Sequence, residues 1–277
     1  MAIVELITVK DLSLQNEGYF AFKHVTFSLT QNQIISIVGD SGSGKTQLLS
    51  TLAKLKTADS GKVEFTPGVR IGYLPQFDPQ VINKSVRIYL EEIRQLSGTL
   101  AVSKEQLKGL IAFMGMSPYL DRQVRQLSYG LKQRVNFLAA VSGHPNVLLL
   151  DEPFSFQNSK YTSNMLEIIK DLADNGSGVV IASSTQDSSI TNYFDANYIM
   201  KNKSMEQVKD KDKEILCMLI FTVKPDSMAL TTEISQYLSA NVSSLVELKI
   251  PLGMKDAIIK EMIDLNYQFE GARILEG

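Results

Sequence analysis

The octapeptide GDSGSGKT at Gly39–Thr46 fits the pattern G-x-x-x-x-G-K-[ST] at each constrained position. The run before it, Ile34–Val38, is apolar and β-branched, which is typical of a buried parallel strand. The run after it, Gln47–Ala53, has the pattern of a helix. Glycines in such a turn permit positive φ, so that successive N–H groups and the positive helix end can approach an anionic phosphate. The stretch therefore predicts a nucleotide site.

The residue types of this stretch suggest their roles. Lys45 is expected to reach the β- and γ-phosphates, and the Thr46 hydroxyl to bind a magnesium ion that bridges them. An ordinary glycine- and serine-rich loop is the alternative, but it does not account for a full match in a strand–turn–helix context. The nucleotide-binding residues expected here are Gly39, Asp40, Ser41, Gly42, Ser43, Gly44, Lys45, Thr46 and Gln47.

The length and composition of the chain limit the number of its domains and the kinds of partner and location that it can have. A chain of 277 residues can form one large domain, or one of about 200 residues plus a small appendix. With a net charge of −2 and scattered Lys and Arg residues, no nucleic acid is expected as a partner. The longest apolar run, Ile215–Val223, is far shorter than the roughly 20 residues of a membrane-spanning helix. Met1–Lys10 lacks the pattern of a secretion signal, so a cytoplasmic location is expected, and Cys217 is expected to be a packed thiol.

The chain begins with a predicted antiparallel edge. Ile3–Leu14 and Lys23–Leu29 alternate like strands, and Asn16–Gly18 has the composition of a turn between them. Tyr19, with Phe20 as the alternative, is expected to stack on a nucleotide base. The other interpretation is that both rings simply pack in the edge sheet.

Two more strands, Gly61–Phe65 and Val69–Leu74, are expected after the phosphate loop. Gln76 follows the second of them, where ligands gather at the carboxyl ends of strands in α/β sheets, so it could contact the metal or the attacking water. A loop glutamine with no such role is the alternative. Apolar residues at helical spacing over Val81–Gln126 predict a helical insert of about residues 81–140.

A second anion site is indicated by the sequence LSYGL at Leu127–Leu131. Ser128 is placed to begin the following helix and Gly130 lies in its first turn, so a hydroxyl, backbone N–H groups and the helix dipole point the same way. Plain helix capping by Ser128 is the alternative.

Asn146–Asp151 is predicted to be a buried strand that ends in two carboxylates, Asp151 and Glu152. Buried carboxylates need partners, and the magnesium ion held by Thr46 is the expected partner of Asp151. Glu152 is expected to polarise the attacking water, which typically contributes a factor of about 10² to 10⁴ in rate. Helix Lys160–Ala173 and a strand ending at Ser183 then continue the α/β alternation.

Together, Gly39–Thr46, Leu127–Leu131 and the Asp151-Glu152 pair resemble the motifs of the ATP-binding subunits of ABC transporters. The resemblance covers about residues 3–208. It implies an α/β fold, with a P-loop NTPase core, an antiparallel β edge and a helical subdomain. It also implies a head-to-tail dimer, formed with itself or a related ATPase, in which Ser128 and Gly130 of one protomer hold the γ-phosphate bound by the other. ATP and Mg²⁺ are the implied cofactors.

The same resemblance implies a partner in the membrane. Such ATPases act with an integral membrane permease subunit, and lie in the cytoplasm at the inner face of the cell membrane through that subunit. The sequence does not define the cargo, its direction or the identity of the permease.

Several positions depart from the family pattern. Tyr129 and Leu131 replace a glycine and a glutamine of the signature Leu-Ser-Gly-Gly-Gln, and Ser155–Asn158 has an amide where the family has an aspartate. The switch histidine is absent, and Ser184 or Thr185 occupies its place. Serine can donate a hydrogen bond to the γ-phosphate but carries no charge near neutral pH. Ser184 is therefore grouped with Glu152 and Gln76 as a catalytic candidate, and ATP binding with slow hydrolysis is expected.

A charged linker at 209–214 is predicted to precede a small α+β domain at 215–277, with ferredoxin-like or similar topology. This domain could sense a ligand, stabilise a dimer or cover a sheet edge. Its expected elements are strand Ile215–Val223, helix Asp226–Ala240, strand Val242–Ile250, helix Met254–Leu265 and strand Phe269–Leu275.

The leading functional hypothesis is an ATPase that supplies energy to a membrane transporter. A catalytically weak ATP-dependent switch, paired with a competent second chain, is the first alternative, because the histidine is missing. A soluble non-transport ATPase of the same family is the second alternative. A small-molecule kinase is disfavoured by the LSYGL stretch.

Overall fold

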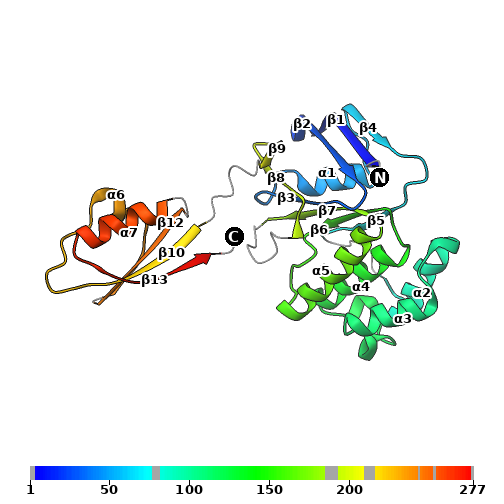
Figure 1. Ribbon diagram of the computed structural model, residues 1–277. Helices are drawn as coiled ribbons and strands as arrows, with labels where there is room; N and C mark the ends of the chain where they lie inside the picture. Colours follow the sequence, from blue (N-terminus) through cyan, green and yellow to red (C-terminus); the bar gives the residue numbers. More distant parts are fainter. Residues whose placement is uncertain are drawn as a thin grey trace. The chain divides into compact units, whose positions relative to one another are not determined.

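The computed structural model describes residues 4–76, 82–184, 193–208, 216–242, 244–251 and 254–275 (Figure 1). These residues form two compact units, one of the described residues up to 208 and one of those from 216 onward. The predicted charged linker at 209–214 lies outside the described residues.

A six-stranded sheet in the order β5-β6-β7-β3-β8-β9 forms the centre of the first unit. Its neighbours are parallel, except that β8 and β9 form an antiparallel hairpin. A parallel sheet covered on both faces needs strands that are apolar throughout, and β6, with the sequence VLLLD, is buried at every position. The strands are β3 (Ile34–Val38), β5 (Ile71–Leu74), β6 (Val147–Asp151), β7 (Gly178–Ser183), β8 (Ala196–Lys201) and β9 (Ser204–Val208).

A second, three-stranded antiparallel sheet has the order β2-β1-β4. It consists of β1 (Glu5–Asn16), β2 (Tyr19–Thr30) and β4 (Ser60–Phe65). The turn at Glu17 and Gly18 joins β1 to β2, and both residues have the positive φ that a tight turn requires. This confirms the predicted antiparallel edge.

Alternate residues of the central strands face two separate cores. Val147 and Leu149 pack with the three-stranded sheet and α1. Leu148 and Leu150 pack with the helices on the opposite face. Figure 1 shows α1 between the two sheets and α2, α3, α4 and α5 on the other side of the central sheet. The helices are α1 (Lys45–Leu52), α2 (Val86–Leu96), α3 (Lys104–Phe113), α4 (Tyr129–Ser142) and α5 (Ser159–Asp174).

The helices begin where their sequences supply caps. The Ser85 hydroxyl accepts a hydrogen bond from the Ile88 N–H at the start of α2, and Ser103 with Gln106 forms a capping box at the start of α3. Short 3₁₀ turns follow α2 and α3 and lead into α4. None of the helices in the described part of the chain is long and apolar enough to span a membrane. The first unit confirms the predicted α/β core with its antiparallel edge and helical subdomain.

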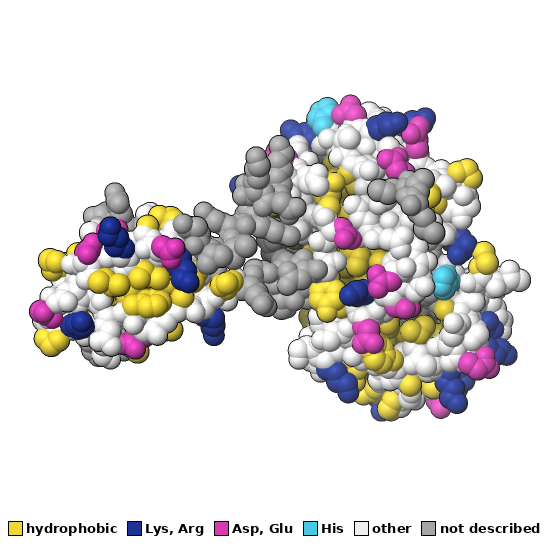
Figure 2. Space-filling model, in the orientation of Figure 1, with side chains coloured by type: hydrophobic (Ala, Val, Ile, Leu, Met, Phe, Trp, Pro, Cys, Tyr) yellow, Lys and Arg dark blue, Asp and Glu magenta, His cyan; other side chains and the backbone are white. Residues whose placement is uncertain are grey.

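The C-terminal unit has the order of elements βαββαβ and the sheet order β11-β12-β10-β13, with antiparallel neighbours throughout. This is the split βαβ arrangement of ferredoxin-like folds. Cys217, Leu219 and Phe221 are fully buried between the sheet and its helices, as expected for a packed thiol. Hydrophobic side chains also gather on the face of this unit shown in Figure 2, flanked by charges of both signs. The elements are β10 (Leu216–Thr222), α6 (Thr232–Ser235), β11 (Leu238–Val242), β12 (Leu245–Pro251), α7 (Lys255–Asp264) and β13 (Gln268–Leu275).

The predicted helix Asp226–Ala240 is wrong over most of its length. Only Thr232–Ser235 is helical, and Leu238–Val242 is a strand that pairs with β12. Ile234 is fully buried, whereas Leu238 is 39% exposed, so the apolar residues at helical spacing do not form one buried face. At the end of the predicted helix, Leu238 and Ala240 pair with β12, so strand pairing overrides the local helical periodicity there. Residues 227–231 form no regular structure.

Candidate functional site

The phosphate loop connects β3 to α1, as its pattern requires. Gly42 and Gly44 have φ of 78° and 115°, in the region that favours glycine. A Cβ on Gly44 would lie 2.2 Å from the Ala21 carbonyl oxygen, and a Cβ on Gly39 would lie 2.3 Å from that of Met200. The glycines therefore also let β2 and β8 pack directly against the loop.

Lys45, at the start of α1, is only 6% exposed. Its Nζ donates hydrogen bonds to the carbonyls of Gly39 (2.5 Å) and Asp40 (3.1 Å). Burial lowers the pKa of Lys45, and the negative charges of Glu152, Asp151 and Asp40 oppose that shift. The ammonium group thus lies inside the loop, where a bound polyphosphate would offer stronger acceptors than carbonyls.

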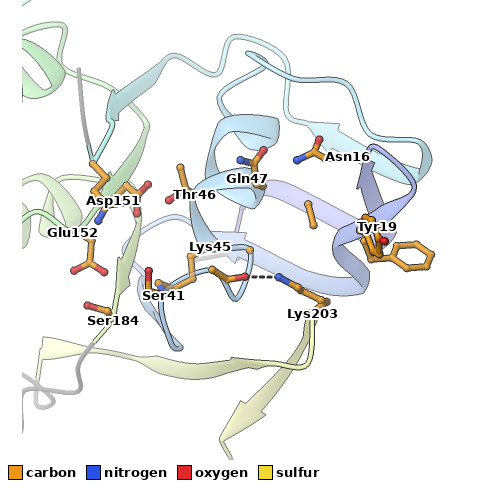
Figure 3. A pocket seen from close by; sticks show the side chains of 15 residues that line it. Asn16, Tyr19, Ser41, Lys45, Thr46, Gln47, Asp151, Glu152, Ser184 and Lys203 are labelled. Atoms are coloured by element: carbon orange, nitrogen blue, oxygen red, sulfur yellow. Dashed lines mark hydrogen bonds between the residues drawn. The ribbon is translucent and has the colours of Figure 1, made fainter. Parts of the chain in front are cut away.

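A cleft of about 360 Å³ opens beside this loop (Figure 3). The predicted residues that line it are Tyr19, Ser41, Gly42, Gly44, Lys45, Thr46, Gln47, Gln76, Asp151, Glu152 and Ser184. Gly39, Asp40 and Ser43 do not line it; they surround the Lys45 ammonium group instead. Asn16, at the end of β1, and Lys203, in the turn between β8 and β9, line the cleft as well; they were not predicted, because neither segment has a phosphate-binding pattern.

Asp151 ends β6 and is fully buried. Burial raises the pKa of its carboxyl group. The Thr46 side chain and the Gln76 backbone lie near enough to lower that pKa, yet among the residues that the structure describes neither carboxylate oxygen has a partner in hydrogen-bond geometry. Two unpaired buried oxygens beside a threonine hydroxyl fit a magnesium ion, which needs few protein ligands when phosphates and waters supply the rest. Elsewhere in the described ranges, no cluster of three or more His, Cys, Asp or Glu residues could hold a metal.

Glu152 is 8% exposed and has a φ of 52°, which is unusual for a residue with a side chain. Two hydrogen bonds stabilise this conformation: its N–H donates to the Ala182 carbonyl (2.9 Å), and its carbonyl accepts from Nε2 of Gln133 (3.1 Å). Because Gln133 lies in α4, the helix that follows the LSYGL stretch also positions Glu152. Strained backbone of this kind is common at active sites.

Ser184 follows β7, is exposed and lines the cleft, whereas Thr185 lies outside the described residues. Neither histidine of the chain lies in the cleft. His24 is on β2, where its Nδ1 lies 2.8 Å from Asp11 Oδ1, and His144 lies in the connection between α4 and β6.

Tyr19 is 81% exposed and Phe20 is 41% exposed, and both line the cleft. Tyr19 therefore is not packed into the edge sheet, and its ring is accessible to a base. In Figure 3 Tyr19 lies near Asn16 and Lys203, at the end of the cleft away from Glu152 and Ser184.

Ser128 and Gly130 do not line this cleft. Ser128 is at the N-cap position of α4, but its side chain makes no capping hydrogen bond, so plain capping does not explain it. A Cβ on Gly130 would lie 2.6 Å from the Phe156 carbonyl oxygen, and Gln157 Nε2 donates to the Gly130 carbonyl (3.0 Å). The start of α4 and the segment after β6 are thereby held together.

Tyr129 and Phe156 form a ring pair on this surface, with centroids 5.4 Å apart, and are 56% and 71% exposed. Asn158, the amide in place of the family's aspartate, caps α5 by accepting a hydrogen bond from the Tyr161 N–H (3.1 Å).

Comparison with known proteins finds relatives that are ATP-binding proteins, in agreement with a phosphate loop beside the cleft. The ABC transporter family model matches residues 22–155. An uncharacterized ABC transporter ATP-binding protein of Haemophilus influenzae is 31% identical over 185 residues, which cover 66% of this chain and 77% of that protein. The zinc import ATP-binding protein ZnuC of Jannaschia sp. is 36% identical over 149 residues, which cover 54% of this chain and 60% of ZnuC. The chain therefore spans less than two thirds of that ZnuC relative.

Solved structures share the fold. A structure of the ATP binding subunit of an ABC transporter has a TM-score of 0.67 at 20% identity, covering 75% of this chain and 91% of that one. The ABC transporter cassette MJ0796, in a dimeric structure, has a TM-score of 0.64 at 21% identity, covering 74% of this chain and 99% of the cassette.

Proposed function

The chain belongs to the family of ABC transporter ATP-binding proteins, and from this premise we propose that it hydrolyses Mg-ATP in the cleft beside Gly39–Thr46 to drive transport by a separate membrane subunit. The observation that carries the proposal is the unpaired Asp151 carboxylate, which is fully buried next to Thr46. A buried charge without a partner is costly, so a site built this way favours a cation. Thr46 and Asp151 would hold the magnesium ion, with Gln76 beside it. When bound, the ion would neutralise charge on the β- and γ-phosphates.

The chain's own residues would then perform the hydrolysis. Lys45 binds the β- and γ-phosphates, Glu152 accepts the proton of the attacking water, and Gln76 orients that water. Ser184 donates a hydrogen bond to the γ-phosphate. Because Ser184 is neutral where the family has a histidine, turnover is slow.

The active unit is a head-to-tail dimer. Support comes from Ser128 and Gly130, which lie outside the cleft of their own chain, and from the absence of a capping bond to the Ser128 hydroxyl. These residues would contact the γ-phosphate bound by the other protomer. The structural neighbours include MJ0796 as a dimer in a post-hydrolysis state with ADP and Pi.

The membrane partner is an integral permease, which holds the ATPase at the cytoplasmic face of the cell membrane. The ATP-binding domain spans residues 1–208, and 209–214 links it to the accessory domain at 215–277. The ZnuC relatives are named for zinc import, and that name does not assign a cargo to this chain.

A second function is favoured by one observation, the serine in place of the switch histidine. In this alternative the chain binds ATP tightly and acts as a switch, while a related second chain supplies the competent site.

The test is steady-state phosphate release by the purified chain with Mg-ATP, compared with Glu152→Gln and Lys45→Ala. Turnover that needs both residues, together with ATP-dependent dimerisation of Glu152→Gln on size-exclusion chromatography, supports the proposed ATPase. ATP binding without turnover that depends on Glu152 favours the switch. No ATP binding at all rejects both functions.

A further inference from the structure

The turn between β8 and β9 brings a lysine to the nucleotide cleft. Its residues Asn202 and Lys203 have φ of 51° and 66°, the positive values of a two-residue hairpin turn. Glycine adopts such values freely, whereas a side chain at the second position strains the backbone. A lysine is therefore an unfavourable residue for the turn alone, which points to another role.

Two contacts hold Lys203 at the phosphate loop. Its carbonyl accepts a hydrogen bond from the Lys23 N–H (2.7 Å), which fixes the tip of the hairpin against β2. Its Nζ donates to the carbonyl of Gly42, as Figure 3 shows. Lys203 is half-buried, lines the cleft, and takes part in none of the ion pairs found among the described residues.

Lys203 and Lys45 reach the same loop from different elements, and each donates to backbone carbonyls of Gly39–Gly42. Their surroundings differ. Lys45 lies toward Glu152, whereas Lys203 lies toward Tyr19 at the other end of the cleft (Figure 3). A nucleotide with its base at Tyr19 and its terminal phosphate near Glu152 would pass both ammonium groups in turn.

We propose that Lys203 binds the phosphate nearest to the ribose of the bound nucleotide. Its Nζ exchanges the neutral Gly42 carbonyl for a charged phosphate oxygen, which is the stronger acceptor. The inference rests on the proposed function, since it requires a nucleotide in this cleft. Lys203 then contributes to the affinity for ATP, ADP and AMP alike, and not to cleavage of the terminal phosphate.

The experiment compares Lys203→Met with Lys201→Met, a matched control, because Lys201 is exposed on β8 and does not line the cleft. Equilibrium dialysis of the full chain measures Kd for ATP, ADP, AMP and adenosine. Lys203→Met is expected to weaken binding of the three nucleotides about tenfold, as for a lost hydrogen bond between charged groups. Binding of adenosine, and the affinities of Lys201→Met, stay within twofold.

Lys203→Gly separates ligand binding from folding. Because glycine tolerates the turn conformation, the nucleotide-free variant is expected to have a Tm at least equal to that of the unsubstituted chain. The rise in Tm on adding ATP becomes smaller than in the unsubstituted chain.

The possible failures are distinguishable. If the unsubstituted chain binds no ATP, or if Lys45→Ala binds it as well as the unsubstituted chain does, the proposed function is rejected. If binding depends on Lys45 but Lys203→Met has unchanged affinities, the inference about Lys203 alone is overturned. A loss confined to ATP, with ADP and AMP unaffected, assigns Lys203 to the terminal phosphate and also overturns it.

Discussion

At the scale of single residues, Asp151 combines two opposing demands. A fully buried carboxylate with both oxygens unpaired destabilises the folded chain, yet the same arrangement is suited to a divalent cation. With Asp151 as the proposed metal ligand, stability and activity conflict at one side chain, as is common at functional sites.

We expect Asp151→Asn to raise the free energy of unfolding at pH 7.5 by about 1 kcal/mol in the absence of nucleotide and metal, because it removes a buried charge. The same variant should lose the extra stabilisation that Mg²⁺ gives to the ATP complex. Urea denaturation with and without Mg-ATP measures both effects. Asp174→Asn, on the exposed face of α5, is the control. A destabilised Asp151→Asn chain that still responds to Mg²⁺ would contradict the assignment.

With Glu152 as the proposed base, Gln133 would be a positioning residue for it. Its Nε2 donates to the Glu152 carbonyl, and the side chain is buried within α4. We expect Gln133→Leu to lower kcat about tenfold while the Kd for ATP changes less than twofold, because a shift of the base affects the chemical step rather than binding. Lys132→Ala, the preceding position, is the control. Equal losses in binding and turnover would indicate a general structural defect instead.

At the scale of elements, α2 contains a bidentate ion pair between Arg94 and Glu91. Arg94 donates to both carboxylate oxygens of Glu91 (3.0 and 2.7 Å), and Gln95 Nε2 adds a third bond (3.0 Å). The hydrogen bonds from Arg94, then that from Gln95, lower the pKa of Glu91 to about 2.

The contribution of this pair should depend on pH. Since the pKa of Glu91 is lower in the folded chain than its ordinary value of 4.5, the stabilisation is present above pH 4.5 and is lost as pH falls toward 2. We expect Glu91→Gln to show a smaller fall in Tm between pH 6 and pH 3 than the unsubstituted chain. The effect should be modest, because the pair is partly exposed and screened. Glu167→Gln, on α5, is the control. Identical pH profiles of Tm for Glu91→Gln and the unsubstituted chain would show that this ion pair does not stabilise α2.

At the scale of the whole molecule, a head-to-tail dimer makes a specific prediction about mixed variants. Lys45→Ala removes the ammonium group from the phosphate loop of its own chain. Ser128→Arg blocks the surface that would contact the nucleotide bound by the partner. Each variant alone should be inactive. An equal mixture should recover about a quarter of the activity, because half of the dimers are mixed and each of those has one intact composite site.

The measurement is phosphate release by the mixture, with each variant mixed with itself as the control. Recovery requires that the two sites of a dimer work independently. The mixture could instead form mixed dimers on size-exclusion chromatography with ATP and bind ATP at one site per dimer without turnover. That result would indicate that hydrolysis requires two intact sites in the same dimer. No mixed dimers at all would contradict the head-to-tail arrangement.

The sequence by itself determined the features that depend on short segments. The strand, phosphate loop and helix around Gly39–Thr46 form as predicted, because glycine placement and β-branched runs act locally. The buried strand β6, which ends at Asp151 just before Glu152, was equally evident. A short, continuous apolar run followed by two carboxylates is typical of a buried strand that ends at a polar site.

Only the tertiary structure decided which distant residues meet. Lys203 reaches the cleft from a turn and Asn16 from the end of β1, both far from the phosphate loop in sequence, and β11 takes up the last residues of a predicted helix because it pairs with β12. The tertiary structure likewise left Asp151 without hydrogen-bond partners among the described residues and linked Gln133 to Glu152. These contacts depend on packing between segments that are distant in the sequence. The local periodicity of hydrophobic residues does not encode such packing.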